Sequence, residues 1–306
     1  MSRKVLIVGG GYGGTEVIRQ MLLRGVRNVE VELVSKKAHF ENTIGCAEII
    51  SEKTKPQELT YDLKQLSAYW GFQLTVRAAG KIDLKEKTVA VGSKTKDYDL
   101  LVVATGSEPN LYNVKGAELA HAAYHLPDFI DLNEKLRQLP DTPNIVVVGA
   151  GFVGLECAAE ILDLYKAMSR KVGMMVVERM DSILPAYNNV SARRITYEHF
   201  TSRGVIFKLG NGVKEVEEGR LILEDGSPVE ADLAIWAAGV KACIAPPQVR
   251  AESLYKGCID VDSRLLIKGR EDAFAIGDVA YVRTNGREAA KMAAEALEQA
   301  RTVAKN

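Results

Sequence analysis

Apolar runs and glycine-rich turns alternate in a regular order along this chain. An apolar run at Val5–Val8 leads into the turn G-G-G-Y-G-G, and an amphipathic pattern follows over Tyr12–Leu23 and stops at Gly25. A second apolar run covers Val29–Val34. Because apolar residues three and four apart mark a helix and short apolar runs mark buried strands, this order predicts a strand, a helix and a parallel strand.

The same order returns in the second half of the chain. The apolar run at Ile145–Val148 leads into G-A-G-F-V-G, a helical pattern follows, and Gly173–Glu178 is the next apolar run. Alternating apolar and polar residues after Lys81 and over Gly212–Glu224 predict a small antiparallel β-meander in each half. The chain is therefore expected to contain one structural unit twice.

Each half closes with an apolar run that ends in small residues, Tyr98–Gly106 in the first half and Ala231–Gly239 in the second. Asp99 and Asp232 occupy matching positions near the start of these runs. A strand end made of small residues can lie close against a bound cofactor. We expect an α/β fold with two Rossmann-like βαβ domains, each carrying a small β-meander.

Both glycine turns fit the pattern G-x-G-x-x-G. The first glycine allows the tight turn, the second lets backbone amides approach a pyrophosphate, and the third lets the helix pack on the strand. The helix N-terminus favours the anion through its free N–H groups and its dipole. Two dinucleotide sites are predicted, formed by Gly9, Gly11, Tyr12, Gly13 and Gly14 and by Gly149, Gly151, Phe152, Val153 and Gly154.

The residue that ends the second strand of each unit is expected to face the adenosine ribose. In the first half this residue is Ser35, with Lys36 beside it, and in the second half it is Glu178. A carboxylate accepts hydrogen bonds from both ribose hydroxyls and repels a 2′-phosphate. We therefore expect NADH over NADPH in the second site, a preference that the neighbouring Arg179 moderates.

The segments between and after the two units suggest a discontinuous first domain. Several prolines surround one expected helix at Asp128–Leu139, which indicates a crossover linker. A last helix over Glu288–Ala304 has an apolar stripe that the first domain would bury. The expected domains are residues 1–108 with 255–306, and an inserted domain of residues 109–254.

The composition of the chain argues against several classes of function. Forty basic and forty acidic residues cancel, so overall charge gives no attraction to nucleic acid. Apolar residues make up 47% of the chain, yet no run is long enough to cross a bilayer, and no leader is recognised at Met1. The four cysteines lack C-x-x-C spacing and the histidines lack metal-ligand spacing, so we expect a cytoplasmic protein without a metal site.

The two units, together with A-T-G at Ala104–Gly106 and A-I-G-D at Ala275–Asp278, resemble the two-dinucleotide-binding flavoproteins. This is the pyridine nucleotide-disulfide oxidoreductase-like family, which includes glutathione-reductase-like enzymes. The resemblance implies FAD in the first unit and NAD(P)H in the inserted unit. It further implies FAD contacts from Ala104, Thr105, Gly106, Gly277 and Asp278, and nicotinamide nucleotide contacts from Ala238 and Gly239.

Within this family the chain looks most like type II NADH dehydrogenases. Four stretches carry the likeness: Val34–Thr43, Val102–Asn110, Asp232–Ala242 and Val261–Ala280. The resemblance implies an FAD-dependent NADH dehydrogenase, in which hydride passes from NADH to flavin N5 and electrons then pass to quinone or a quinone-like acceptor. Glu156 matches the family's glutamate near the nicotinamide and flavin rings.

The chain departs from those dehydrogenases at its C-terminal end. They continue into a segment that attaches them to the membrane, whereas this sequence stops at Asn306. Their last helix carries glutamines beside the quinone path, and the corresponding positions here are Ala294 and Glu298. Contact with the cytoplasmic face of a membrane is therefore expected to be peripheral at most, and a homodimer is one assembly that the family allows.

Two other functions stay open. Cys46 lies 11 residues after Ser35, close to where NADH oxidases and coenzyme A disulfide reductases keep a redox cysteine, although the flanking Ser and Gly of those enzymes are missing. A thiolate there could attack a disulfide or a peroxide. Alternatively, the chain could be an NADH-responsive flavoprotein that binds a partner, similar to apoptosis-inducing factor. Cys157 is expected to pack in a core.

Overall fold

The computed structural model describes residues 2–243, 254–284 and 287–306. Contacts within the chain divide it into two compact units. Unit 1 contains Met1–Asn42, Thr60–Glu108 and Lys241–Asn306, and unit 2 contains Thr43–Leu59 and Pro109–Val240.

These units differ from the expected domains in two places. Thr43–Leu59 belongs to unit 2, because its buried residues Cys46, Ile49, Ile50 and Leu59 pack in the apolar core of that unit. Unit 1 resumes at Lys241 rather than at residue 255. The inserted unit is therefore shorter at its C-terminal end than the sequence pattern suggested, and it gains a segment from the first half of the chain.

Unit 1 is built on a five-stranded parallel sheet in the order β22-β9-β1-β2-β5. Its strands are β1 (Arg3–Val8), β2 (Val29–Ser35), β5 (Gln73–Val76), β9 (Leu100–Val103) and β22 (Ala273–Ala275). The helices are α1 (Tyr12–Leu23), α2 (Leu63–Trp70) and α6 (Ala293–Val303). An antiparallel meander contains β6 (Ala79–Asp83), β7 (Thr88–Val91) and β8 (Lys94–Asp97).

Several short elements complete unit 1. The strands are β3 (His39–Glu41), β4 (Thr60–Asp62), β20 (Leu254–Tyr255), β21 (Cys258–Asp260), β23 (Ala280–Tyr281), β24 (Arg283–Thr284) and β25 (Arg287–Glu288). The 3₁₀ helix η5 covers Gly277–Val279. Strands β10 (Ser107–Pro109) and β19 (Val240–Ala242) pair where the chain passes between the units.

Unit 2 repeats the architecture with the sheet order β11-β18-β12-β13-β14, again all parallel. Its sheet strands are β11 (His121–Ala122), β12 (Asn144–Val148), β13 (Gly173–Glu178), β14 (Ile206–Leu209) and β18 (Leu233–Trp236). Its meander strands are β15 (Val213–Glu217), β16 (Arg220–Leu223) and β17 (Pro228–Glu230). Its helices are α3 (Leu126–Gln138), α4 (Phe152–Ala167) and α5 (Val190–Ser202), with the 3₁₀ helices η1 (Thr43–Ile49), η2 (Pro56–Leu59) and η3 (Ala117–Leu119).

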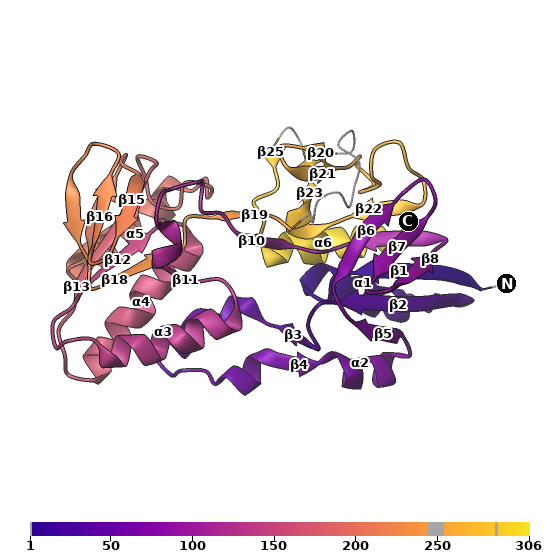
Figure 1. The fold of residues 1–306 in the computed structure, drawn as a ribbon, viewed down its shortest axis with the longest axis horizontal. Helices are drawn as coiled ribbons and strands as arrows, with labels where there is room; N and C mark the ends of the chain where they lie inside the picture. Colours follow the sequence, from indigo (N-terminus) through magenta and orange to yellow (C-terminus); the bar gives the residue numbers. More distant parts are fainter. Residues whose placement is uncertain (1, 244–253, 285–286) are drawn as a thin grey trace. The chain divides into compact units, whose positions relative to one another are not determined.

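The two sheets differ in the part of the sequence that supplies the strand at one edge, β22 in unit 1 and β11 in unit 2. In unit 2 that strand, β11, precedes the glycine turn in the sequence, whereas in unit 1 the equivalent strand, β22, comes near the end of the chain. In Figure 1 the indigo β1 and the yellow β22 thus share one sheet although they derive from opposite ends of the sequence. Unit 1 is therefore discontinuous, as the sequence pattern predicted.

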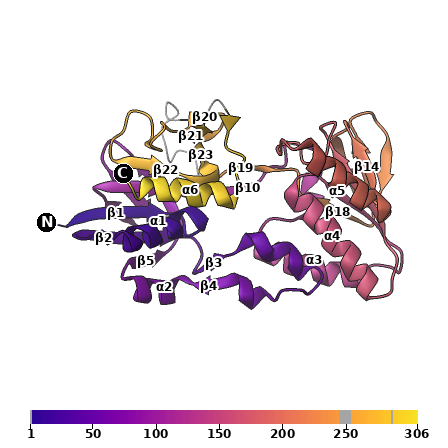
Figure 2. The ribbon, with the colours of Figure 1, turned by 180° about the vertical axis from the view of Figure 1, so that it is seen from behind.

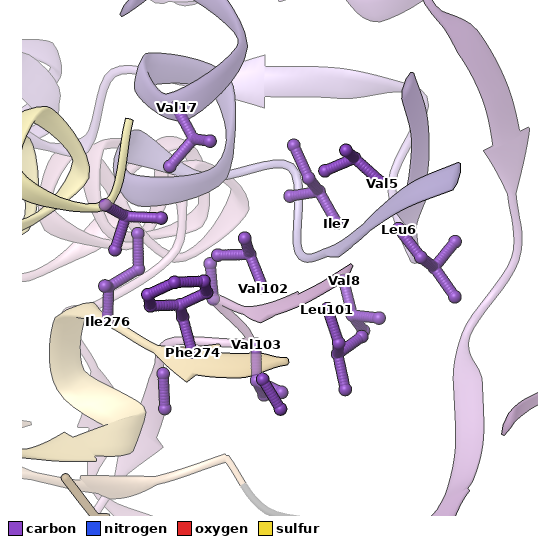
Figure 3. Close-up of a cluster of buried hydrophobic side chains, with 14 of the residues drawn as sticks. Val5, Leu6, Ile7, Val8, Val17, Leu101, Val102, Val103, Phe274 and Ile276 are labelled. Atoms are coloured by element: carbon purple, nitrogen blue, oxygen red, sulfur yellow. The ribbon is translucent and has the colours of Figure 1, made fainter. Parts of the chain in front are cut away.

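Packing on the unit 1 sheet joins the two ends of the chain. Figure 2 shows α6 beside α1, and the two helices contact each other along their length. Figure 3 shows Val17 of α1 and Phe274 and Ile276 of the C-terminal part beside side chains of β1 and β9. Ala296, Ala300 and Val303 are the buried face of α6, so the predicted burial of this apolar stripe by the first domain is confirmed. Burial of such surface stabilises by about 25 cal/mol per Å².

The last helix begins later than predicted. It starts at Ala293 instead of Glu288, because Glu288 pairs with Arg283 in a short antiparallel ladder. Lys291 then takes a positive φ of 55°, and Met292 is extended. A backbone in these conformations cannot continue a helix, so the helical pattern of the sequence overestimates the element by about one turn.

Matching aspartates fix the register of both sheets. The Asp99 carboxylate accepts a hydrogen bond of 2.7 Å from the backbone N–H of Lys4, and the Asp232 carboxylate accepts one of 2.7 Å from that of Asn144. Each aspartate thus satisfies an amide at the start of the central strand. The repeat recognised in the sequence is therefore a repeat of hydrogen bonds as well as of elements.

The third glycine of each turn is required by the backbone itself. A Cβ atom at Gly14 would lie 2.0 Å from the carbonyl oxygen of Gly9, and a Cβ atom at Gly154 would lie 2.0 Å from that of Gly149. Real Cβ atoms do not approach an oxygen so closely. The helix can therefore start immediately behind the strand only where this position has no side chain.

We predict that Gly154→Ala destabilises unit 2 by about 3 kcal/mol or more, since the added methyl group meets backbone that cannot move aside easily. Gly151→Ala is the matched control, because nothing lies within 4 Å of the Cβ position at Gly151. This control should change the free energy of unfolding by about 1 kcal/mol at most, a cost that arises because alanine is a poorer N-cap than glycine. Urea unfolding of both variants measures the difference, and equal stability of the two would contradict the packing described here.

Candidate dinucleotide sites

The first glycine turn leaves the start of α1 open to an anion. Gly9 has a φ of 117°, and a Cβ atom there would lie 2.1 Å from the carbonyl oxygen of Ala104, so the end of β9 lies directly against the turn. Nothing lies within 4 Å of the Cβ position at Gly11. No side chain caps α1 and its first turn has no acidic residue, so this helix N-terminus suits a phosphate.

Ser35 lies beside this turn, where the pattern placed it. A Cβ atom at Gly10 would be 2.6 Å from Ser35 Oγ. The hydroxyl donates a hydrogen bond of 2.7 Å to the carbonyl oxygen of Lys37, so toward a ligand it can act only as an acceptor. The side chain of Lys36 is exposed, and Tyr12 donates a hydrogen bond of 2.6 Å to the Asn42 side chain.

The other predicted residues of unit 1 meet at the ends of β9 and β22. Thr105 Oγ1 donates a hydrogen bond of 2.8 Å to the carbonyl oxygen of Cys243. Gly106 has a φ of 72° with open space at its Cβ position. Ser107 Oγ donates a hydrogen bond of 2.5 Å to Asp278 Oδ2. Burial raises the pKa of Asp278, and this hydrogen bond partly opposes the effect.

The second glycine turn has the same geometry. Gly149 has a φ of 107°, and a Cβ atom there would lie 2.5 Å from the carbonyl oxygen of Ala237. Helix α4 begins after Gly151 without a side-chain cap and without an acid in its first turn. Phe152 and Val153 are exposed beside the turn, and the Phe152 ring meets the Tyr187 ring edge to face at 5.7 Å. The amides of this helix are thus also free to bind an anion.

Glu178 is held against the second turn by backbone amides. Its Oε2 accepts a hydrogen bond of 2.8 Å from the N–H of Ala150, and its Oε1 accepts one of 2.9 Å from the N–H of Met180. The carboxylate is therefore fixed at the end of β13, and each oxygen keeps a lone pair for a further donor. Arg179 is directed to Glu224, with 3.4 Å between Arg179 Nε and Glu224 Oε1.

The end of β18 borders the second turn as the end of β9 borders the first. Gly239 has a φ of 114°, and its carbonyl oxygen accepts a hydrogen bond of 3.0 Å from the N–H of Asn110. Ala238 precedes it, and a Cβ atom at Gly239 would lie 3.0 Å from the hydroxyl of Tyr112. The structure thus brings Ala238 and Gly239 into the same part of unit 2 as the glycine turn.

Glu156 belongs to a group of acids in unit 2. Helix α4 begins at Phe152, so Glu156 is its fifth residue and lies just beyond the first turn. The pKa of Glu156 is raised, first by desolvation and then by the negative charges of Glu160 and Glu48. Glu160 stands four residues later on the same helix face. The Glu156 side chain is exposed, and a carboxyl group beside other negative charges keeps its proton to a higher pH than an isolated one.

The segment Thr43–Leu59 is attached to α4 through Glu160. Ser51 Oγ donates a hydrogen bond to the Glu160 carboxylate, and Lys53 Nζ lies 2.9 Å from Glu160 Oε2 and 2.7 Å from Asp163 Oδ2. Asn133 of α3 adds a hydrogen bond of 2.8 Å to the carbonyl oxygen of Ile50. These contacts place η1, which carries Glu48, against the helix that carries Glu156.

The cysteines behave mainly as small apolar residues. Cys46 and Cys157 are both 0% exposed in the core of unit 2, and burial raises the pKa of Cys157. The predicted packing role of Cys157 is confirmed. Cys258 is buried in unit 1, with Lys291 Nζ at 3.3 Å from its sulfur atom.

The sequence pattern did not identify the residues that support the predicted ones. Gln299 accepts a hydrogen bond of 2.7 Å from the N–H of Gly277, and Lys291 donates one to the carbonyl oxygen of Asp278. Ser107 could have been found, because it directly follows the A-T-G strand end. No spacing links Gln299 or Lys291 to the A-I-G-D motif, since these contacts depend on how α6 returns to unit 1.

The described ranges contain neither a cluster of metal ligands nor a membrane-spanning helix. Within residues 2–243, 254–284 and 287–306, no group of three His, Cys, Asp or Glu side chains is arranged to hold a metal ion. In the same ranges no helix is long and apolar enough to cross a bilayer.

The residues present fit two dinucleotides. Each unit has an uncapped helix behind a turn whose middle glycine faces open space, which is the geometry that a pyrophosphate requires. Asp278 in unit 1 and Glu178 in unit 2 add carboxylate oxygens, a type of acceptor that suits ligand hydroxyl groups.

Comparison with known proteins identifies the family of this chain. Residues 3–300 match the family described as pyridine nucleotide-disulphide oxidoreductase. Type II NADH:quinone oxidoreductase of Staphylococcus saprophyticus is 24% identical over 94% of this chain and 76% of its own length.

Several solved structures share the fold. Reduced Bacillus anthracis CoADR-RHD superposes with a TM-score of 0.85 at 23% identity, covering 100% of this chain, which spans only 56% of that protein. The water-forming NADH oxidase of Lactobacillus brevis, bound to NADH, superposes with a TM-score of 0.84 at 25% identity, covering 100% of this chain and 69% of the other. FAD and NADH, the expected cofactors, agree with these findings. The chain is an NAD(P)H-dependent oxidoreductase that belongs to the pyridine nucleotide-disulphide oxidoreductase family.

Proposed function

We propose that this protein is an FAD-dependent NADH dehydrogenase that passes electrons to quinone or a quinone-like acceptor. Unit 1 holds FAD and unit 2 holds NADH in this proposal. The observation that carries it is Glu178, which two backbone amides hold at the mouth of an uncapped glycine-turn helix. The type II NADH:quinone oxidoreductase that resembles the chain over most of its length supports quinone as acceptor.

The residues of unit 1 bind and orient the flavin nucleotide. FAD, when bound, accepts hydride from NADH and passes electrons on to the acceptor. The amides behind Gly11 hold the pyrophosphate, with Tyr12, Gly13 and Gly14 completing the turn. Asp278 accepts a hydrogen bond from a ligand hydroxyl while Ser107 keeps its other oxygen bound. Thr105, anchored on Cys243, fixes the strand end that borders the ligand.

The residues of unit 2 select NADH. Glu178 keeps lone pairs free for the ribose hydroxyls, and its charge repels a 2′-phosphate. Arg179, the nearest cation in the sequence, is directed to Glu224 instead of standing free for such a phosphate. The nucleotide selectivity therefore rests on a carboxylate whose position is set by the backbone.

Glu156 holds a proton for the acceptor. Reduction of a quinone to a quinol consumes two protons as well as two electrons, and a nearby acid whose pKa is raised supplies a proton more readily at neutral pH. Desolvation and the charges of Glu160 and Glu48 give Glu156 this property. Because quinones are dissolved in membranes, the protein works at a membrane surface in this proposal. The homodimer stays a prediction.

We predict that NADH bleaches the absorbance of protein-bound FAD under anaerobic conditions, and that a soluble quinone restores it within milliseconds to seconds. Stopped-flow absorbance measures both steps. Coenzyme A disulfide is the comparison acceptor. Restoration by the disulfide together with no reaction with quinone would reject the quinone reductase and favour a disulfide reductase.

Glu178→Ala should weaken NADH binding at least tenfold, because charge-assisted hydrogen bonds contribute about 1.5 to 3 kcal/mol. NADPH binding should stay the same or become tighter, since the repulsion of the 2′-phosphate is lost. Asp181→Asn is the control, because Asp181 is an exposed acid three positions further along the chain. Dissociation constants come from flavin-free titrations of nucleotide fluorescence. Equal weakening of both nucleotides would show that Glu178 only supports the turn.

Cys46→Ser separates the proposed function from its cysteine-dependent alternative. We expect turnover with quinone to change less than twofold, because Cys46 is buried among apolar side chains. Cys157→Ser reports the general effect of a hydroxyl group buried in the same core. Loss of quinone turnover in Cys46→Ser alone, at unchanged thermal stability, would make Cys46 a redox residue.

A further inference from the structure

A tyrosine hydroxyl group faces the chain just after β18 in unit 2. A Cβ atom at Gly239 would lie 3.0 Å from Tyr112 Oη, so the hydroxyl group takes the place that a side chain at Gly239 would need. The Tyr112 side chain is 54% exposed, and its hydroxyl group has no hydrogen-bond partner among the described residues. The hydroxyl group can therefore bind a ligand without first breaking a bond to the described part of the protein.

Asn110 holds Tyr112 in this position. Its side-chain Oδ1 accepts a hydrogen bond of 3.0 Å from the N–H of Tyr112. Its backbone N–H donates one of 3.0 Å to the carbonyl oxygen of Gly239, and its carbonyl oxygen accepts one of 2.9 Å from Trp236 Nε1. Because Trp236 is the last residue of β18, Asn110 joins the tyrosine to the end of that strand.

The backbone at Tyr112 is unusual for a residue with a side chain. Tyr112 and Asn113 have φ values of 50° and 56°, in the left-handed region that favours glycine. Such conformations persist where surrounding contacts hold them. The three hydrogen bonds of Asn110 supply contacts of this kind, so the position of the tyrosine is set by the end of the sheet.

The order of the unit 2 sheet assigns the two halves of a bound dinucleotide. The glycine turn follows β12, and β13 and β18 flank β12 on opposite sides. In such a sheet the pyrophosphate binds at the turn and one nucleoside lies on each side. Glu178, at the end of β13, takes the adenosine ribose in the proposed function, so the nicotinamide nucleoside lies over the end of β18. Tyr112 and Gly239 are on this nicotinamide side.

Within the nicotinamide half, the ribose is the group nearest to the turn. The carbonyl oxygen of Ala237 borders the turn itself, because it lies 2.5 Å from the Cβ position at Gly149. Gly239 comes two residues later, so it is the next part of this strand end beyond the pyrophosphate. The group that follows the pyrophosphate in the nucleotide is the nicotinamide ribose, and its hydroxyl groups can both donate to and accept from a phenol.

We propose that Tyr112 binds the nicotinamide ribose of the nucleotide in unit 2 through a hydrogen bond between its hydroxyl group and a ribose hydroxyl group. The inference rests on the proposed placement of NADH in unit 2. Glu178 and Tyr112 then bind the two riboses from the two strand ends that flank β12. The ribose at Tyr112 carries the reacting ring, so this contact contributes to the orientation that hydride transfer requires.

The test is calorimetric titration of the purified protein, with its flavin bound, with NAD⁺ and with ADP. NAD⁺ does not reduce the flavin, and ADP lacks the nicotinamide ribose. Tyr112→Phe should raise the dissociation constant of NAD⁺ about fivefold, the effect of one hydrogen bond between neutral groups. The dissociation constant of ADP should change less than twofold, because the adenosine and pyrophosphate contacts are unchanged.

Tyr197→Phe is the matched control. Tyr197 is an exposed tyrosine of α5 whose ring stacks on Phe207 with 5.0 Å between the ring centroids. Removal of its hydroxyl group should leave both dissociation constants unchanged. The Tyr112 side chain is more than half exposed, so Tyr112→Phe should keep the thermal midpoint of the unmodified protein.

An analogue of NAD⁺ without hydroxyl groups on the nicotinamide ribose gives a second measurement. The unmodified protein should bind this analogue about fivefold more weakly than NAD⁺, again the effect of one hydrogen bond. Tyr112→Phe should bind the analogue as the unmodified protein does, because the partner of the tyrosine hydroxyl group is already missing. The two removals together therefore cost no more than either one alone.

Three results would overturn the ribose contact while leaving the proposed function intact. They are a change in NAD⁺ binding of less than twofold in Tyr112→Phe, equal weakening of ADP and NAD⁺, and the same weakening of the analogue as of NAD⁺. Glu178→Ala tests the placement separately, since it should weaken ADP and NAD⁺ by similar factors. Unchanged binding of both nucleotides to Glu178→Ala would overturn the proposed placement of the nucleotide, and this inference with it.

Discussion

The close approach of backbone to backbone at the two glycine turns is the constraint on which both units depend. In each turn the third glycine has no room for a Cβ atom because the carbonyl oxygen of the first glycine lies 2.0 Å from that position. In each turn the first glycine also lies against the carbonyl oxygen at the end of the neighbouring strand, Ala104 in unit 1 and Ala237 in unit 2. Strand, turn and helix are thereby locked together, and the helix N-terminus has no side chain over it. A fold restriction thus creates a place for an anion.

The same arrangement of strand, glycine turn and helix is surrounded by different residues in the two units. In unit 2 the end of β13 offers a carboxylate, and the hydrogen bonds of Glu178 to Ala150 and Met180 keep it beside the turn. In unit 1 the equivalent end of β2 offers only the hydroxyl of Ser35, which is engaged with Lys37. The acid of unit 1 comes instead from η5, so the two units place negative charge on different sides of equivalent turns.

The sequence pattern predicted the elements whose bounds depend on residues that are close together in the sequence. Helix α1 and strand β13 have the bounds that the apolar pattern indicated, because a glycine turn and a strand end are specified within a few residues. The assignment of Thr43–Leu59 to unit 2 depends on packing against α3 and α4 far along the chain, and no periodicity reports it. The contacts of Gln299 with Gly277 and of Lys291 with Asp278 were missed for the same reason. The predicted roles of the site residues remain predictions, since each depends on where a ligand atom lies.

The different origin of β22 and β11 has a consequence for biosynthesis. All five strands of the unit 2 sheet have been translated once β18 has been made, so this sheet can form before the rest of the chain is complete. The unit 1 sheet waits for β22 and α6, which are translated last. The nascent chain must therefore carry an incomplete first sheet, with the β9 edge uncovered, throughout the synthesis of the inserted unit. An open edge of this kind is where chaperones or early flavin binding would protect the chain from wrong pairing.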